Sequence, residues 1–241
     1  MPAKAEILAQ LQREILSLQG FKSPPPDAED VVGLGSINQA FPHAVFPLSA
    51  MHEFICTNAE EATASSAFIA GLVSTLMQEN GTAIWISASR FIFPPALKAF
   101  GLQPHQVIFL YLKKEKEVVW VVEEALKCAA LTAVVCDMKE ISFTASRRLQ
   151  LAIEKSGVSC FILRQQSNNG ATTAVARWQI KPQQSGAADG LPGVGHPRWQ
   201  VKLLKVRNGK PGIWNMEWVS GKFRHVSKLA LIHQEVKKKT G

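Results

Sequence analysis

The chain has 241 residues, 46% of them hydrophobic and 19% charged, which suits one α/β domain of moderate size with a short appendage, or two small domains, and excludes wholesale disorder. No apolar run approaches the ~20 residues that cross a bilayer, and the first ten residues lack a signal-peptide core, so we expect a cytoplasmic protein rather than a membrane or secreted one. The net charge is +8, a balance typical of proteins with a polyanionic partner.

A helix and a stiff linker are expected at the N-terminal end. Apolar residues recur at helical spacing over residues 3–19, and the following segment, 20–30, contains Pro24, Pro25 and Pro26. Three consecutive prolines cannot continue a helix, so this segment should separate the helix from the body of the chain. The apolar stripe of the helix has two possible docking places, its own domain or a partner, and the sequence favours neither.

Residues 31–225 alternate short apolar runs with helical segments, as expected of one α/β domain. Near-continuous apolar strands separated by helices indicate a mainly parallel sheet with helices on both faces. The expected strands are Met51–Cys56, Ala83–Ser87, Val107–Leu112, Ala133–Asp137 and Ser159–Leu163, and the expected helices are Ala59–Gln78, Pro94–Phe100, Glu115–Cys128 and Phe143–Ser156.

The pattern changes in the last third of this body. Three further strands are expected at Thr172–Ile180, Arg198–Arg207 and Gly212–Val219 with no helix between them, so they should pair antiparallel. Asn208–Gly209 predicts a tight turn between the last two strands. The stretch Pro182–Pro197 contains several glycines and prolines and predicts a long, mobile loop.

Residues 226–241 predict a basic C-terminal helix or tail. Residues 198–241 carry eleven Lys and Arg against two acids, whereas the other 197 residues carry 16 basic and 17 acidic side chains. All of the excess positive charge therefore lies at this end of the chain. A basic segment of this kind indicates nucleic acid or an acidic protein surface as the partner, with a solubilising tail as the alternative.

The segment after the first expected strand does not fit a phosphate-binding loop. Such a loop needs glycines, a Lys and a Ser or Thr to hold phosphates and magnesium. Between Ala50 and Ala70 there is no Gly, Lys or Arg, and there are three acids, Glu53, Glu60 and Glu61. Carboxylates at the mouth of the loop would repel a triphosphate. We therefore expect no nucleotide cofactor, although acids at a helix N-terminus also favour its dipole.

Other catalytic and metal-binding patterns find little support. Asp137 ends an expected strand where P-loop proteins hold magnesium, but without the loop we interpret it as a polar strand end facing the crevice. No zinc-protease motif and no G-x-S-x-G motif occurs. The four cysteines form no C-x-x-C pair and predict buried free thiols rather than a metal site: Cys56, Cys128, Cys136 and Cys160. The chain is therefore expected not to be an enzyme and to hold no metal or cofactor.

Three stretches of the sequence resemble RecA-type recombinases. Gly81–Leu110 resembles the region around the second recombinase strand, Cys160–Gln165 (CFILRQ) continues the likeness, and Arg198–Trp218 looks like a late antiparallel hairpin. The combination of EISFTASRRLQLAIEKSG, ARWQI and LLKVRNGKPG is similar, more closely still, to the ImuA family. The resemblance covers residues 30–225 and implies a RecA-like core fold.

The resemblance also implies a function, with departures from a recombinase. ImuA-type proteins are RecA-related accessory proteins of damage-induced translesion synthesis, understood to act with a Y-family-like partner and an error-prone replicative-type polymerase, and in some cases with the recombinase. Here Ser89 stands in place of the recombinase's catalytic Glu, and the two DNA-binding loops, Met138–Thr144 and Gln165–Thr172, look shortened. Lys205-x-Arg207 matches the basic pair that reaches across a recombinase subunit interface.

Our leading hypothesis is a non-catalytic accessory or scaffold protein of error-prone translesion synthesis, which binds a polymerase partner, a recombinase or both. DNA is a possible further partner through the basic C-terminal segment. The candidate contacts are basic residues whose clustering, rather than any one of them, supports the hypothesis. They are Arg198, Lys202, Lys205, Arg207, Lys210, Lys222, Arg224 and, on the helix after Asp137, Arg147 and Arg148.

Alternatives remain open at this point. Trp199, Trp214 and Trp218 fit base stacking or core packing, and the shared strand face of Trp214, Met216 and Trp218 favours the core. A damage-induced cell-division inhibitor with a RecA-like fold and no P-loop is a second function class. An ATPase with an unconventional loop is a third.

Overall fold

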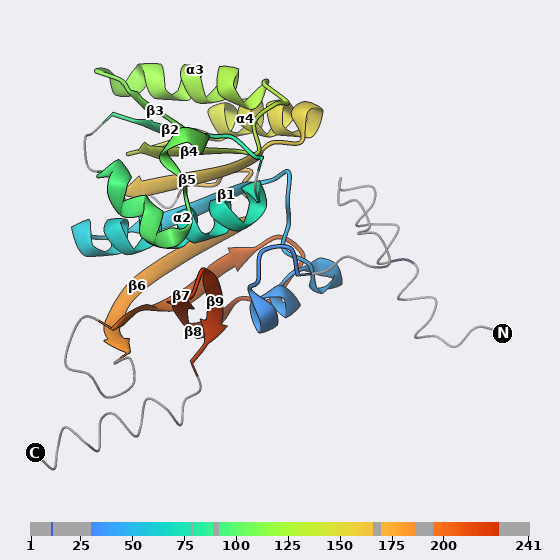
Figure 1. The fold of residues 1–241 in the computed structure, drawn as a ribbon. Helices are drawn as coiled ribbons and strands as arrows, with labels where there is room; N and C mark the ends of the chain where they lie inside the picture. The colour runs from blue at the N-terminus through green and yellow to red at the C-terminus, as the bar shows by residue number, and fades with distance from the viewer. Residues whose placement is uncertain are drawn as a thin grey trace, which may run out of the picture.

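The computed structural model describes residue 11 and residues 30–78, 80–88, 92–165, 170–186 and 195–226. In these residues one nine-stranded sheet runs through the molecule in the order β3-β2-β4-β5-β1-β6-β7-β8-β9 (Figure 1). The strands are β1 (Met51–Cys56), β2 (Ala83–Ser87), β3 (Val107–Tyr111), β4 (Ala133–Met138), β5 (Ser159–Gln165), β6 (Ala176–Gly186), β7 (His196–Val206), β8 (Gly212–Val219) and β9 (Lys222–His225).

The α-helices of these residues are α2 (Ala59–Met77), α3 (Glu115–Leu126) and α4 (Phe143–Ser156). Short 3-10 helices are η1 (Gly35–Ala40), η2 (Pro42–Ala44), η3 (Pro94–Phe100) and η4 (Pro104–Gln106). The segment expected as a short helix at Pro94–Phe100 is thus a 3-10 helix with the same bounds. None of the described helices is long and apolar enough to span a membrane.

The parallel half of the sheet confirms the expected α/β core. Strands β3, β2, β4, β5, β1 and β6 pair in parallel, with α2 on one face and α3 and α4 on the other (Figure 1). The apolar strand residues divide between two clusters: Phe54 and Phe161 pack on the α2 side, whereas Cys160 and Ile162 pack on the opposite side. Alternation along each strand produces this division. Together with the late antiparallel strands, the arrangement fits a RecA-like core.

Helix α2 packs against both halves of the sheet. Phe68 contacts Trp199 and Phe223 with ring centroids 5.7 and 4.8 Å away, which ties the helix to the antiparallel strands. Gly71 permits this close approach, because a Cβ there would lie 2.8 Å from the ring of Phe223 and 2.9 Å from that of Trp218. The helix is buried on most sides, and its buried residues include the small polar side chains of Ser65 and Ser66 as well as apolar ones.

The three expected late strands are confirmed as antiparallel neighbours, but the loop between the first two is shorter than predicted. The stretch Pro182–Pro197 was expected as loop, whereas β6 continues to Gly186 and β7 begins at His196. Beyond Trp178, β6 pairs with β7 alone, because its pairing with β1 ends there. Pro182 is tolerated on this free edge, where a missing N–H breaks no bond to a second neighbour.

Strand β9 has no counterpart in the sequence prediction. Ser220 and Gly221 both have positive φ, 51° and 76°, and form the two-residue turn that returns β8 to β9. The predicted turn at Asn208–Gly209 does lie between β7 and β8, with Asn208 at φ 56°.

The predictions for the two ends of the chain fall mostly outside the described residues. This holds for the helix over 3–19 apart from Leu11, for the linker over 20–30 apart from Asp30, and for the basic tail after Val226. The segment that follows the linker packs on the α2 side of the sheet, where Phe41 and Phe46 join the core.

His52 is a buried polar residue at the centre of this core. Its ring stacks on Phe46 at 4.5 Å and accepts a hydrogen bond at Nδ1 from the indole N–H of Trp178 at 3.3 Å. Its Nε2 therefore carries the proton and donates to the carbonyl oxygen of Pro47 at 2.8 Å. Burial lowers the pKa of His52 from 6.5 to about 4, and the bond to Pro47 opposes this only in part.

We expect acid to destabilise the fold through His52. Between pH 6.5 and about pH 4 the unfolded chain binds a proton that the folded chain does not, so the free energy of unfolding falls as the pH falls, by on the order of 3 kcal/mol over that window. Chemical denaturation at pH 7 and pH 4.5 measures this loss. The variant His52→Gln keeps a donor but no titrating ring, so its loss should be smaller; an equal loss would contradict the assignment.

Candidate functional site

The loop between β1 and α2 is closed by its own side chains. Asn58 caps α2 by accepting a hydrogen bond from the N–H of Glu61 at 2.8 Å, and Glu61 Oε2 accepts one from the N–H of Thr57 at 2.9 Å. Backbone N–H groups at this place, after the first strand of a parallel sheet, are the donors that a phosphate-binding loop offers to a nucleotide. Here the N–H groups of Thr57 and Glu61 are satisfied by an arrangement close to a capping box.

The Glu61 carboxylate also binds β6. The side-chain amide of Gln179 donates to both of its oxygens, at 3.2 and 3.3 Å. Burial by itself would raise the pKa of Glu61, but the hydrogen bonds from Thr57 and Gln179 and the charge of Lys181 outweigh burial and lower it. An ionised internal carboxylate therefore lies where a phosphate anion would be held.

A buried charged cluster lies on the other face of the sheet, across β5, β1 and β6. Glu53 has no exposed surface, and its Oε1 and Oε2 accept hydrogen bonds from Arg164 Nη1 at 3.2 Å and Arg177 Nε at 2.8 Å. Arg177 also donates to the carbonyl oxygen of Gly170 at 3.1 Å. A lone buried carboxylate would be costly, so the two guanidinium groups are what allow Glu53 inside the sheet.

The segment around Thr173, just before β6, is held by hydrogen bonds from Arg207 and with Ser146. Arg207 Nη2 donates to the carbonyl oxygen of Thr173 at 3.1 Å. Thr173 exchanges two hydrogen bonds with Ser146 of α4: its N–H donates to Ser146 Oγ at 3.2 Å, and its hydroxyl donates to the Ser146 carbonyl at 2.9 Å. The stretch Gln165–Thr172, which the recombinase resemblance implies is a shortened DNA-binding loop, therefore leads into a firmly held segment.

Asp137 lies within β4 and is half-buried. Its Oδ1 accepts a hydrogen bond from the N–H of Ala88, just after β2, at 3.3 Å. Within the part of the chain that the structure describes, no group of three or more His, Cys, Asp or Glu side chains gathers as a metal site requires. Ser89, which the recombinase resemblance places at the position of a catalytic Glu, lies outside the described residues.

Most of the predicted basic candidates share one face of β6–β9. One face of these strands packs on the α2 side, through residues such as Trp178, Val201 and Met216. The opposite face, here called the outer face, carries the alternate residues of each strand. Besides Arg177, which is bound to Glu53, its basic side chains are Lys181 and five of the predicted candidates, Arg198, Lys202, Lys205, Lys222 and Arg224.

Comparison with known proteins decides the family. The chain is 31% identical over 231 residues to the protein ImuA of Caulobacter vibrioides, in two strains of that organism, and the match covers 88% of this chain and 93% of the relative. The chain belongs to the ImuA family. A scan against protein-family models gives no match. The ImuA resemblance, which rested on the sequences of α4, β6 and β7–β8, is thereby confirmed over 88% of the chain.

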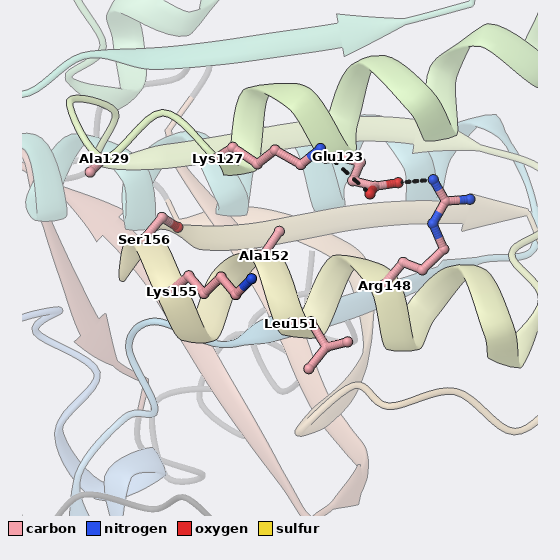
Figure 2. Close-up of a pocket in the computed structure, with 8 residues that line it drawn as sticks. All are labelled: Glu123, Lys127, Ala129, Arg148, Leu151, Ala152, Lys155 and Ser156. Carbon is pink, nitrogen blue, oxygen red and sulfur yellow. Dashed lines mark ion pairs between the residues drawn. The ribbon is translucent and has the colours of Figure 1, made fainter.

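Two predicted candidates, Arg147 and Arg148, lie on α4 and not on the outer face. Figure 2 shows Arg148 directed at Glu123 of α3, 2.5 Å away, with Lys127 approaching the same carboxylate from the other side at 3.7 Å. These charges line a shallow groove of about 420 Å³ between the two helices. Arg147 lies 4.0 Å from Glu154. Both arginines of the ImuA-family chain are thus paired along α3 and α4.

The remaining two candidates, Arg207 and Lys210, do not join the basic side chains of the outer face. Arg207 turns toward Thr173, while Lys210 is exposed in the turn between β7 and β8. The Lys205-x-Arg207 pair therefore does not act as one unit, since Lys205 lies on the outer face opposite Arg177.

The tryptophans confirm the core interpretation. Trp199 and Trp218 are buried, and Trp214 packs against the same α2-side cluster. Trp218 donates its indole N–H to the carbonyl oxygen of Ala99 in η3 at 3.0 Å. No base-stacking surface is therefore made by these three rings.

Sequence reasoning missed Arg164 and Arg177 and the pairing of Glu53 with them. The available signal was a charge inside an otherwise apolar strand, as in FILRQ and MHEFIC. The prediction of buried thiols holds for three cysteines but is wrong for Cys128, which is exposed just after the end of α3 at Leu126. Burial raises the pKa of Cys56 to about 11, so that thiol is unreactive.

Proposed function

We propose that this ImuA-family chain is a non-catalytic accessory protein of the DNA-damage response, which supports error-prone translesion synthesis by binding a polymerase partner, a recombinase or both. Family membership supports the place of the chain in damage-induced mutagenesis. The observation that carries the non-catalytic part is the closure of the β1–α2 loop by Glu61. The Glu61 carboxylate would repel a triphosphate, and it already accepts hydrogen bonds from the Thr57 N–H and the Gln179 amide.

The nucleotide part of the proposal is tested by calorimetric titration of the full chain with Mg-ATP. We expect no heat of binding up to millimolar nucleotide, because removing Glu61 from its partners would be needed first. A dissociation constant in the micromolar range would overturn the non-catalytic assignment.

The partner part is tested in DNA-damaged cells that express the tagged chain. We expect the purified complex to contain a translesion polymerase or the recombinase, and to retain it after nuclease treatment. Recovery of a tubulin-like division protein in its place would overturn the translesion assignment.

A further inference from the structure

The outer face of β6–β9 carries more positive than negative side chains among the described residues. Besides Arg177, which is bound to Glu53, it presents six basic side chains: Lys181, Arg198, Lys202, Lys205, Lys222 and Arg224. The described residues of these strands place one carboxylate on it, Glu217, which accepts a hydrogen bond from Arg198 Nε at 3.0 Å and stands directly across the ladder from Arg224. Lys181 also lies near Glu61 of α2, whose pKa its charge helps to lower. Four of the six, all except Arg198 and Lys202, are exposed.

The register brings these side chains together from four strands. Arg198 of β7 is opposite Glu217 of β8, and Glu217 is opposite Arg224 of β9. The bulge beside Trp178 brings Lys205 opposite Arg177, so Lys205 stays on the outer face. Of the described helices, α3 and α4 lie over the parallel strands and α2 lies against the inner face (Figure 1), so none of them covers this charge.

We infer that the outer face binds the phosphate backbone of DNA without reading its sequence. This goes beyond the proposed function, which requires only a protein partner. The extent of the face fits: from Arg198 to Lys205 along β7 is about 20 Å, and four strands span about 15 Å. That length matches about six successive phosphates of one DNA strand.

The composition of the face favours phosphate over an acidic protein. Protein interfaces are depleted in Lys and have an apolar centre rich in aromatic residues. Four of the six basic residues here are Lys, and the large exposed apolar side chains on this face are Leu204 and Ile213, 36% and 58% exposed. The tryptophans of β7 and β8 point inward, so neither base stacking nor an aromatic anchor is offered. Contacts to the backbone alone position a protein on DNA without sequence preference.

Fluorescence anisotropy with labelled single-stranded DNA of about 20 nucleotides, and with the matching duplex, tests the inference over a range of salt. Three full-length proteins are compared: the natural chain, the outer-face double variant Lys202→Glu with Arg224→Glu, and the control double variant Lys98→Glu with Lys114→Glu. The control changes the net charge equally at exposed residues of η3 and at the start of α3. Basic residues after position 226 are the same in all three proteins, so differences report the face.

We expect the outer-face variant to bind DNA at least tenfold more weakly than the natural chain, and the slope of log K against log salt to be smaller in magnitude by about two. The dissociation constant of the control variant should lie within threefold of that of the natural chain. Thermal melts confirm that all three are folded. Equal binding by the natural chain and the outer-face variant overturns the inference, and so does an equal loss in the control. If the outer-face variant instead loses binding to poly-aspartate or to its nuclease-resistant partner while the natural chain ignores DNA, the face belongs to an acidic protein. In that case the inference fails and the proposed function stands.

Discussion

Replacing Glu53 with Gln should destabilise the fold by about 3–5 kcal/mol. The change keeps the size of the side chain but removes the negative charge that Arg164 and Arg177 bind, at 3.2 and 2.8 Å from its oxygens. Arg164 is 3% exposed, so water cannot replace the lost carboxylate. Urea denaturation at pH 7 measures the effect as a lower midpoint at an unchanged slope.

A matched control is available in Glu217→Gln. It removes the same charge from another arginine–carboxylate pair, in which Arg198 is 13% and Glu217 is 19% exposed, and should cost about 1 kcal/mol or less. Replacing the whole cluster, with Glu53→Met, Arg164→Leu and Arg177→Met, should recover much of the stability, because none of these three positions then holds an unpaired buried charge. If Glu53→Gln and Glu217→Gln cost the same, the buried cluster does not hold these strands together.

The parallel half of the fold could be predicted because its signals are local. A strand buried on both faces is an unbroken apolar run, as in AVVCDM, and the helix between two such strands has its own periodicity and caps. Helix α4 was predicted with its exact bounds because Ser142 caps its start and Gly157, with φ 79°, ends it. Such signals lie within a few residues of the boundaries that they set.

The candidate site could be predicted only in part, because its contacts join distant residues. The absence of a phosphate loop was readable between Ala50 and Ala70, but the bond of Glu61 to Gln179 spans 118 positions. Likewise the basic residues of the C-terminal strands were readable as a cluster of charge. Only the register shows that Lys202 and Arg224 share the outer face whereas Arg207 turns back to Thr173.

Strand β6 explains how the two halves act as one body. Consecutive residues of this strand bind three different parts of the parallel half: Arg177 binds Glu53, Trp178 binds His52, and Gln179 binds Glu61. The same strand then pairs with β7 and begins the outer face. The closed β1–α2 loop and the basic outer face are therefore fixed relative to each other by one short stretch of chain.

Replacing Trp178 with Ala should accordingly cost about 3–5 kcal/mol and damage both halves at once. Trp178 has no exposed surface, lies 6.0 Å from Phe54 in a stacked pair, and donates its indole N–H to His52. Its loss leaves a cavity and an unpaired ring nitrogen, since Nδ1 of His52 then has no donor. Denaturation at pH 7 measures the cost.

Trp120→Ala is the matched control, because the same side chain on α3 is 60% exposed and its loss should change the free energy of unfolding by about 0.5 kcal/mol or less. If Trp178 joins the halves, amide hydrogen exchange in the Trp178→Ala variant should be faster in β1 and in β7 together than in the natural chain. The two proteins are compared at denaturant concentrations equally far below their own midpoints of unfolding. Faster exchange confined to β7–β9 would instead mean that the antiparallel strands unfold on their own, and that the loop at Glu61 and the outer face are held independently.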